Sequence, residues 1–181
     1  MGIVLSDMVK SDIEFVKNLY IEAFPPEERA PFGYIKRRHF NGKARMFVAS
    51  RDGGKIGFAY IIEHNDVVYL LFLAVNGAER GKGYGTEILS LIKDMFKGKR
   101  LLIAREPIDE NADNNAQRVA RHKFYLKNGF TDSDCKIHEA GVTYDVMTVG
   151  GDVSPDEYRA LITRWTGRFI LLFVKMEMTR K

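Results

Sequence analysis

The sequence predicts an α/β fold in which a mixed, mostly antiparallel sheet is flanked by helices. Three strand-like segments joined by tight turns follow one another in the first half, which is typical of an antiparallel meander. Helical patterns precede this meander, and helices alternate with strands after it. The chain has 181 residues, of which 45% are hydrophobic and 29% charged. This composition suits one ordinary globular domain and excludes collagen, coiled coil and disordered tail.

The N-terminal region is expected to hold a short strand and two helices. Ile3–Leu5 begins the strand. Ser11 and Glu14 have the spacing of a capping box, and apolar residues at helical spacing continue the helix to about Phe24. Two prolines stop this helix. They are followed by acidic residues and a bent connection to a basic helix at 34–40.

The central region predicts the meander and one further helix. The expected strands are Met46–Ser50, Lys55–Glu63 and Val67–Val75. Turn-forming Asp, Gly and Asn residues separate them. A helix follows at Gly83–Phe96, because its apolar residues form one broad face.

The C-terminal region continues with alternating elements. The expected elements are a strand at Leu101–Ala104, a helix ending near Leu126, strands at Lys136–Glu139 and Val142–Val149, a helix at Ser154–Trp165 and a strand-like segment at Arg168–Met178. Asn128 and Gly129 form the expected cap that ends the helix near Leu126. We therefore expect one domain over residues 1–150 and a helix-strand extension over 151–181 that packs on it.

Several functional classes are disfavoured by what the chain lacks. Its single cysteine, Cys135, cannot form an internal disulfide, and its four histidines lie far apart, so we predict no metal site and a structural thiol. The longest apolar run, Val67–Val75, is too short to cross a membrane, and the N-terminus has no signal-peptide pattern. These features predict a cytoplasmic protein without a membrane partner.

The most informative segment is a buried strand that passes through a glycine-rich turn into a helix. The first amides of a helix lack internal partners and carry partial positive charge, so the turn favours a phosphate group. The glycines are Gly81, Gly83 and Gly85, and the basic residues beside them are Arg80 and Lys82. Without Cβ atoms, these glycines let the main chain approach a ligand closely.

Two standard phosphate-binding loops do not fit this segment. A nucleoside triphosphate loop needs Ser or Thr after Gly-Lys, but Gly83 follows Lys82 here. A dinucleotide loop needs Gly-x-Gly-x-x-Gly after the first strand of a βαβ unit, whereas this loop follows a meander and reads Gly-x-Gly-x-Gly. Neither standard loop therefore explains this segment, and the alternative to another phosphate ligand is a glycine-rich loop without a ligand.

The same segment resembles the GNAT superfamily of N-acetyltransferases. Arg80–Gly85 matches that superfamily's Arg/Gln-x-x-Gly-x-Gly/Ala motif and follows Val75, which corresponds to the apolar residue closing the fourth strand. Phe124–Phe130 is similar to its Tyr-x-x-x-Gly-Phe helix ending. The order of elements also agrees from about residue 3 to 149.

The resemblance implies a GNAT-type fold and acetyl-CoA as co-substrate, without a metal. It implies that the backbone of Leu73 and Val75 pairs with the pantetheine arm. It further implies that the glycine loop holds the pyrophosphate through Arg80, Gly81, Lys82, Gly83, Tyr84, Gly85 and Thr86. Residues 76–100 carry six Lys or Arg against three Asp or Glu, and 112–130 carry four against one. The net charge of +4 is therefore concentrated on segments proposed to hold the coenzyme.

By the same resemblance, Tyr125 lies near the thioester sulfur and serves as an acid. The alternative is that Tyr125 is a core aromatic beside Phe124. For the base we choose Glu106, which follows the strand at Leu101–Ala104, and we expect partial burial to raise its pKa. The alternatives are that Glu106 is solvated or pairs with Arg105, and that water mediates the deprotonation.

Two further sets of residues are assigned around the acceptor. Weaker candidates for the base are Glu22, Glu27 and Glu28, and we expect these residues, Glu27 and Glu28 above all, to line the acceptor pocket instead. Arg118 and Arg121 depart from the family, which often has Asn and Ala at these places. Either the helix is extended by about a turn, or these arginines bind an anion such as the 3′-phosphate of the coenzyme or an acidic acceptor.

The leading hypothesis is an N-acetyltransferase that passes an acetyl group from acetyl-CoA to a primary amine by direct attack in a ternary complex. The amine belongs to a small molecule or a peptide, and the extension at 151–181 either covers the acceptor or forms a homodimer contact. One alternative is an RNA- or ribosome-associated protein, suggested by the basic cluster Lys36–Phe40, although a solvated helix face is the simpler interpretation. The other is a catalytically silent acyl-CoA sensor.

Overall fold

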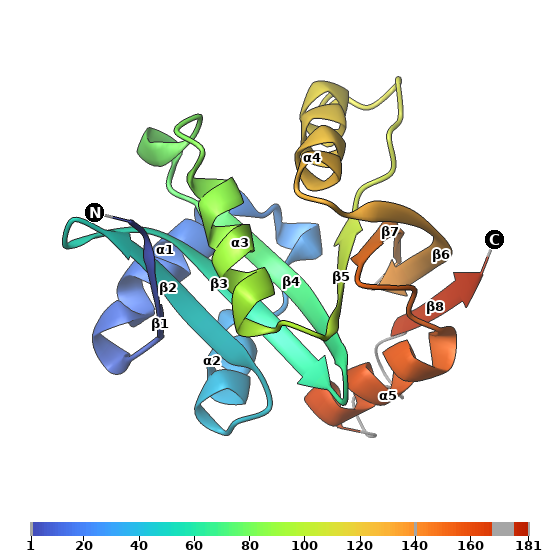
Figure 1. The fold of residues 1–181 in the computed structure, drawn as a ribbon, viewed down its shortest axis with the longest axis horizontal. Coiled ribbons are helices and arrows are strands. Elements are labelled where there is room, and N and C mark those ends of the chain that lie inside the picture. The colour runs from blue at the N-terminus through green and yellow to red at the C-terminus, as the bar shows by residue number, and fades with distance from the viewer. Residues whose placement is uncertain (1, 140, 168–175, 181) are drawn as a thin grey trace. The chain divides into compact units, whose positions relative to one another are not determined.

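A computed structural model of the protein describes residues 2–139, 141–167 and 176–180. Its helices and strands are shown in Figure 1. The α-helices are α1 Ile13–Ala23, α2 Phe32–Phe40, α3 Tyr84–Met95, α4 Asn115–Lys127 and α5 Pro155–Thr166. The strands are β1 Val4–Asp7, β2 Arg45–Arg51, β3 Gly54–His64, β4 Val67–Val75, β5 Arg100–Arg105, β6 Thr131–Glu139, β7 Val142–Val149 and β8 Met176–Arg180.

The strands follow the order β1-β2-β3-β4-β5-β7-β6-β8. The β4–β5 pair is parallel, with Val67–Tyr69 opposite Arg100–Leu102. The pairs β1–β2, β2–β3, β5–β7, β6–β7 and β6–β8 are antiparallel. This arrangement confirms the predicted α/β class with a mixed, mostly antiparallel sheet.

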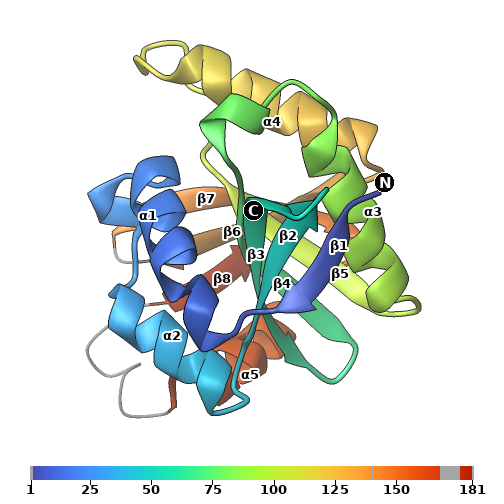
Figure 2. The same ribbon diagram turned by 90° about the vertical axis from the view of Figure 1, so that its left-hand side faces the viewer.

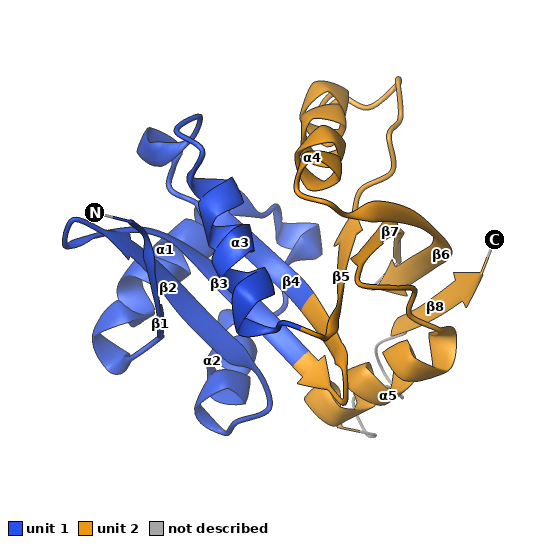
Figure 3. Ribbon diagram, in the orientation of Figure 1, with its two compact units in different colours: residues 1–62, 70–97 blue, residues 63–69, 98–181 orange. Residues whose placement is uncertain are grey.

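The chain divides into two compact units, which are coloured separately in Figure 3. Unit 1 comprises residues 1–62 and 70–97, and unit 2 comprises residues 63–69 and 98–181. Strand β4 begins in unit 2 and continues in unit 1. The predicted helix-strand extension, as far as it is described, belongs to unit 2.

Unit 1 is built around an aromatic cluster between its helices and strands. Within this unit, α1 and α2 lie on one face of the strands and α3 on the other (Figure 2). The ring of Tyr20 on α1 is 5.0 Å from Phe72 on β4, and Phe24 is 4.9 Å from the same ring. Tyr20, Phe58 and Phe72 are all at least 94% buried. These aromatic contacts hold α1 against β3 and β4, since edge-on ring pairs add to the stability from apolar burial.

Strands β3 and β4 approach one another closely at Gly57. A Cβ atom on Gly57 would lie 2.5 Å from the carbonyl oxygen of Ala74. Real Cβ atoms do not come so close to a backbone oxygen, so only glycine fits at this point. The close approach supports the end of β4, from which the glycine-rich loop starts.

Unit 2 is tied together by an ion-pair network at Arg100. Its guanidinium group pairs with Asp66 at 2.7 Å and with Glu157 on α5 at 2.5 Å. The Ser154 side chain caps α5 and forms a capping box with Glu157. Glu157 therefore joins the start of α5 to β5, while Tyr158 and Trp165 are buried on the inner face of the helix.

Three predicted details need correction or fall outside the described residues. The capping box of Ser11 and Glu14 is wrong: a 3-10 turn at Lys10–Asp12 comes first, and α1 begins at Ile13 with Asp12 as its N-cap. Strand β6 begins at Thr131 rather than at Lys136. The polar residues at its start alternate with buried Ser133 and Cys135, which conceals the strand in the sequence. Of the strand expected over 168–178, residues 168–175 lie outside the described residues.

Candidate functional site

The glycine-rich loop of unit 1 has the local structure of an anion site. Gly81 and Gly83 have φ angles of +78° and +84°, in the region that disfavours side chains, and Gly83 is the N-cap of α3. Within the described part of the chain, no residue accepts a backbone hydrogen bond from the amides of Gly81–Gly85. The amide of Thr86, by contrast, already donates to the Gly83 carbonyl at 3.0 Å. Five successive amides are thus available to a ligand.

The basic side chains at this loop are held but remain accessible. Nε of Arg80 donates to the Val75 carbonyl at 3.1 Å, and its guanidinium lies 3.9 Å from Glu22 on α1. Lys82 pairs with Glu79 at 2.9 Å. The side chains of Arg80 and Lys82 are 57% and 50% exposed. Such surface pairs are weak, so both cations can turn to a bound phosphate at little cost.

One cation near this loop, Arg51, is not predicted from the sequence. The guanidinium of Arg51, at the end of β2, lies 5.0 Å from the centre of the Tyr84 ring. Arg51 also lies 3.8 Å from Glu87 on α3. Nothing in the local sequence indicates this contact, because it depends on how β2 and α3 pack within unit 1.

The second half of β4 alternates between buried and partly open side chains. Phe72 and Ala74 are buried, whereas Leu71, Leu73 and Val75 are of intermediate exposure. Leu73 and Val75 therefore share the more open face of the strand, as period-two alternation requires. Their side chains leave this stretch of β4 less covered than the face that contacts the aromatic cluster.

Tyr125 in unit 2 is a buried phenol on the last turn of α4. The residue is only 9% exposed, and its ring lies 5.2 Å from Phe124 and 5.4 Å from Phe130. Burial raises the pKa of Tyr125 to about 12, although the charge of Arg121 opposes this. The helix ends at Asn128 and Gly129 as predicted, and the Phe130 amide returns to the Tyr125 carbonyl at 3.1 Å.

Glu106 is held by several donors from α4 and its N-cap. Its carboxylate pairs with Arg118 at 2.8 Å and with Arg121 at 3.1 Å, and it accepts from the Asn114 amide at 3.2 Å. The Glu106 side chain is 13% exposed. The anion beside the two unusual arginines is thus a carboxylate of the chain itself.

Arg105, the partner that sequence analysis considered for Glu106, points elsewhere. Its guanidinium pairs with Asp132 at 3.2 Å and with Asp145 at 3.4 Å, and its contact with Glu106 is a hydrogen bond to the backbone carbonyl. His122 on α4 also binds Asp132, at 2.9 Å. Burial works to raise the pKa of Asp132, but the hydrogen bonds from His122 and Arg105 outweigh it and lower the pKa.

A second carboxyl group in unit 2 escaped the sequence analysis. Oε1 of Glu139 on β6 accepts hydrogen bonds from the hydroxyl of Tyr158 on α5 and, at 3.5 Å, from that of Tyr69 on β4. Burial raises the pKa of Glu139 to about 7, even though the two phenols work in the opposite direction. In the sequence, Glu139 is 70 positions from Tyr69 and 19 positions from Tyr158. No local pattern in the sequence could bring them together.

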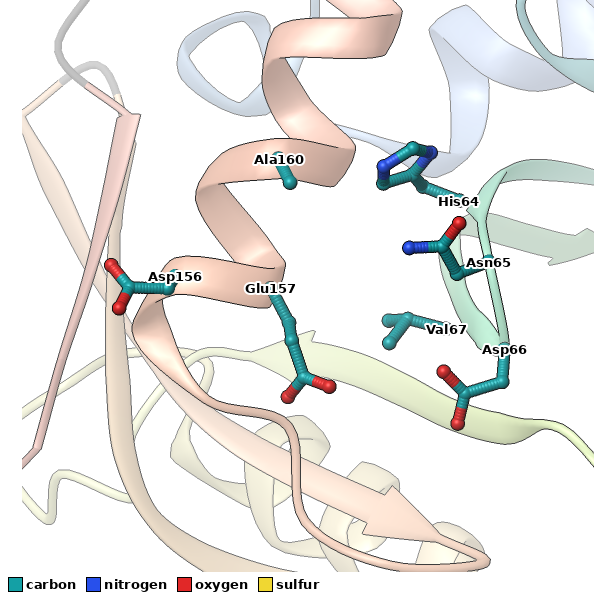
Figure 4. A pocket seen from close by; sticks show the side chains of 7 residues that line it. All are labelled: His64, Asn65, Asp66, Val67, Asp156, Glu157 and Ala160. Atoms are coloured by element: carbon teal, nitrogen blue, oxygen red, sulfur yellow. The ribbon is translucent and has the colours of Figure 1, made fainter.

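A pocket in unit 2 lies at the turn between β3 and β4 and the start of α5, and Figure 4 shows its lining. Its acidic side chains include Asp66 and Glu157. Both carboxylates are already paired with Arg100. The pocket contains none of the predicted site residues and is not our candidate site.

The remaining predicted residues occupy varied positions. Glu27 and Glu28 lie in the 3-10 turn Pro26–Glu28, where Glu27 is exposed and Glu28 of intermediate exposure. Cys135 is buried, with 2% exposure. In the basic helix α2, His39 is structural, because it bonds to the backbone of Met8 at 2.8 Å and Met46 at 3.1 Å.

The described residues offer neither a metal-binding cluster nor a membrane-spanning helix. Within the ranges that the structure describes, no group of three or more His, Cys, Asp or Glu side chains could hold a metal ion. Among the described helices, none is long and apolar enough to span a bilayer.

Comparisons with known proteins agree with this fold and loop, which together define an acyltransferase. The chain belongs to the GNAT acetyltransferase family, since the model of the acetyltransferase (GNAT) domain matches residues 42–132. This match confirms the resemblance drawn from the two sequence motifs. A search of curated proteins finds no match.

Solved structures share the fold at low sequence identity. A GNAT-family protein from Bacteroides thetaiotaomicron is 24% identical, with a TM-score of 0.69 over 87% of this chain and 92% of that chain. An aminoglycoside 6′-N-acetyltransferase complexed with coenzyme A is 15% identical, with a TM-score of 0.64 over 84% and 99%. Naa50 from Arabidopsis thaliana, in complex with a bisubstrate analogue CoA-Ac-MVNAL, is 19% identical, with a TM-score of 0.62 over 83% and 100%.

Proposed function

We propose that this protein transfers an acetyl group from acetyl-CoA to a primary amine by direct attack in a ternary complex. The observation that carries the proposal is the row of unpartnered amides at Gly81–Gly85, which precedes and opens α3. Such a row suits the pyrophosphate of a coenzyme, because each amide can donate to an anionic oxygen. The coenzyme A bound to the similar aminoglycoside acetyltransferase supports the choice of coenzyme.

The coenzyme contacts follow from unit 1. The backbone of Leu73 and Val75 would pair with the pantetheine arm, as another strand would. Arg80, Lys82, Tyr84 and Thr86 would complete the loop around the pyrophosphate. Because the side chains of Arg80 and Lys82 are about half exposed, they can supply positive charge without the full cost of breaking a buried ion pair. No metal is needed in this scheme.

The catalytic roles fall on unit 2. With a pKa of about 12, Tyr125 keeps its proton at neutral pH and can donate toward the departing thiolate. The sequence analysis selected Glu106 as the base. Its carboxylate is engaged by two guanidinium groups and an amide, so it could accept a proton only by giving up these contacts. Glu106 remains a candidate for the general base, and Glu106→Gln tests it.

The acceptor is proposed to be a small-molecule or peptide amine. The similar structures include proteins named for an aminoglycoside and complexed with a peptide-containing analogue. In this chain, the exposed acidic residue Glu27 and its neighbour Glu28 would favour a cationic amine over a neutral or acidic acceptor. A primary amine fits, since it is positively charged before it reacts.

The proposal is tested with the purified protein in two steps. Acetyl-CoA at a hundredfold excess over its dissociation constant should stabilise the protein by about 2.7 kcal/mol, measured as a thermal shift. A thiol-release assay with polyamines, aminoglycosides and short peptides should then show coenzyme release with at least one amine, and mass spectrometry should show the acetylated product. Absence of any stabilisation by acetyl-CoA would refute the proposal. Stabilisation without release would favour an acyl-CoA sensor.

A further inference from the structure

The cluster of Tyr69, Glu139 and Tyr158 gathers three ionisable side chains from three elements of unit 2. The two tyrosines are almost fully buried, at 1% and 0% exposure. Both donate to the same oxygen of Glu139, Oε1. Among the described residues, none is bonded to the other carboxyl oxygen, Oε2. A carboxyl group oriented by two phenols and with one oxygen unengaged has the form of a proton acceptor.

Among the described residues, the groups that shift the pKa values of Glu139 and Tyr69 are tyrosines and these two residues themselves, rather than cations. Tyr69 interacts electrostatically with Tyr144 on β7 and with Tyr125 on α4. Strand β8 places Met176 opposite Glu139. The neighbouring His138 is engaged with hydroxyl groups of Thr143 and Thr179, as expected for the opposite face of β6. The surroundings of Glu139 therefore differ from those of Glu106, which two arginines bind.

Tyr69 also has a weak electrostatic link to the proposed acid. Burial and the charge of Glu139 are the main causes that raise the pKa of Tyr69, and Tyr125 adds the smallest of the named contributions. Tyr69 donates a hydrogen bond to the Glu139 carboxyl group. That group has a pKa of about 7, close to the pH at which the protein would work. A general base is most effective when its pKa lies near the working pH.

Resting on the proposed function, we propose that Glu139 is the proton acceptor of acetyl transfer, with Tyr69 and Tyr158 positioning its carboxylate. The acceptor ammonium loses one proton to Glu139, directly or through water, and this proton later passes to solvent. The neutral amine then attacks the thioester carbonyl, so that a C–N bond forms and the C–S bond breaks. The second proton leaves nitrogen and reaches the thiolate, while the Tyr125 hydroxyl donates a hydrogen bond to the sulfur as negative charge develops on it. The products are the amide and free coenzyme A.

The test is the pH profile of kcat/KM for the amine that the wild-type protein acetylates fastest in the assay above. Wild type should lose activity as the pH falls below about 7, because Glu139 must be ionised. Glu139→Gln should lower kcat/KM about 100-fold at pH 7 and abolish this acidic limb. Glu106→Gln is measured alongside. Glu110→Gln, at an exposed loop position, is the matched control and should behave as wild type.

Tyr158→Phe tests whether Glu139 sets the acidic limb of the pH profile. A purely structural role of Glu139 would leave the position of this limb unchanged. The Tyr158 hydroxyl lowers the pKa of Glu139, so its removal should shift the acidic limb to higher pH while activity at alkaline pH is retained. If Glu139→Gln does not fold, this shift decides the question. An unmoved limb in Tyr158→Phe then overturns the inference.

The remaining outcomes separate this inference from the proposed function. Wild-type activity in Glu139→Gln at every pH overturns the inference. If Glu106→Gln alone is inactive, the base is Glu106, and if neither variant loses activity, water deprotonates the amine. A wild-type protein that acetylates no amine refutes the proposed function, and the inference fails with it.

Discussion

At the scale of single residues, Tyr125 has an observed packing role and a proposed chemical one. Its ring contacts Phe124 and Phe130, which explains its burial. Burial in turn raises the pKa of its hydroxyl to about 12, so the phenol remains protonated. The thiol of a coenzyme, if it resembles cysteine, has a pKa of about 8.5. Full transfer from the phenol is therefore uphill, and we propose that Tyr125 acts mainly by donating a hydrogen bond as negative charge develops on sulfur.

Tyr125→Phe tests this role. We expect kcat to fall about 100-fold, because the donor is lost while the ring is kept, and the affinity for acetyl-CoA to change less than about twofold. Steady-state kinetics and calorimetric binding measure the two effects. Phe124→Leu is the packing control and should retain most of kcat. Unchanged turnover in Tyr125→Phe would assign the residue to packing alone.

Glu106 shows how a tertiary contact changes the interpretation of a residue. Sequence position placed this carboxylate after β5 and suggested a base. One prediction for Arg118 and Arg121 is that they bind an anion from a ligand. In the structure, the anion that both arginines bind is Glu106. Because these residues are 12 and 15 positions apart and lie in a loop and a helix, no helical spacing rule predicts the contact.

At the scale of elements, the glycine-rich loop and the start of α3 act as one unit. The positive φ angles of Gly81 and Gly83 turn the chain so that successive amides have no described internal acceptor. An added Cβ at either glycine would meet nothing within 4 Å. Backbone conformation therefore requires these glycines, crowding from the protein itself does not, and access for the proposed coenzyme is a second proposed requirement.

Gly83→Ala separates these two requirements. Gly98 provides a matched control, because its φ of +85° is nearly equal to the +84° of Gly83 and its Cβ position is equally open. Both alanine variants should lose about 1 kcal/mol of stability from backbone strain, measured by urea unfolding. Only Gly83→Ala should weaken acetyl-CoA binding, by about tenfold, since one or more amide contacts are lost. Equal affinities in the two variants would show that the loop does not bind the coenzyme.

At the scale of the whole molecule, two carboxyl groups of unit 2 give stability opposite dependences on pH. Arg100 and the Ser154 cap lower the pKa of Glu157 to about 2, so its contribution is present above the ordinary pKa and is lost as the pH falls toward 2. Glu139 behaves in the reverse sense. Its folded pKa of about 7 exceeds its ordinary value of 4.5, so the folded state binds more protons between these values.

The free energy of unfolding should therefore contain a contribution from Glu139 that declines as the pH rises from 4.5 to about 7. Its size is on the order of 3 kcal/mol. Glu139→Gln removes this titration, so the difference in unfolding free energy between wild type and variant should change across this window. Urea unfolding at several pH values measures it, with Glu110→Gln as the control. Parallel curves for wild type and Glu139→Gln would contradict the raised pKa.

Most secondary structure was predictable because its determinants are local. Strands β4 and β7 have the predicted bounds, and α3 differs from its prediction by one residue at each end. The beginning of β6 was missed, because it pairs through polar residues such as Thr131 and Asp132 and contains a register shift. The start of α1 was misplaced because Asp12 accepts a hydrogen bond from the Val9 amide and pairs with Lys55. These contacts stabilise a 3-10 turn in place of the predicted capping box of Ser11 and Glu14.

The sequence by itself determined the family, the glycine loop and the helix that carries Tyr125, because motif spacing, glycine placement and apolar periodicity act over a few residues. Only the tertiary structure decided which charges and phenols meet. Glu106 faces Arg118 and Arg121, and Glu139 lies between Tyr69 and Tyr158. These contacts depend on strand pairing and helix packing between distant segments. Together with burial, the two phenol contacts set the pKa of Glu139, the proposed proton acceptor, and no local pattern encodes them.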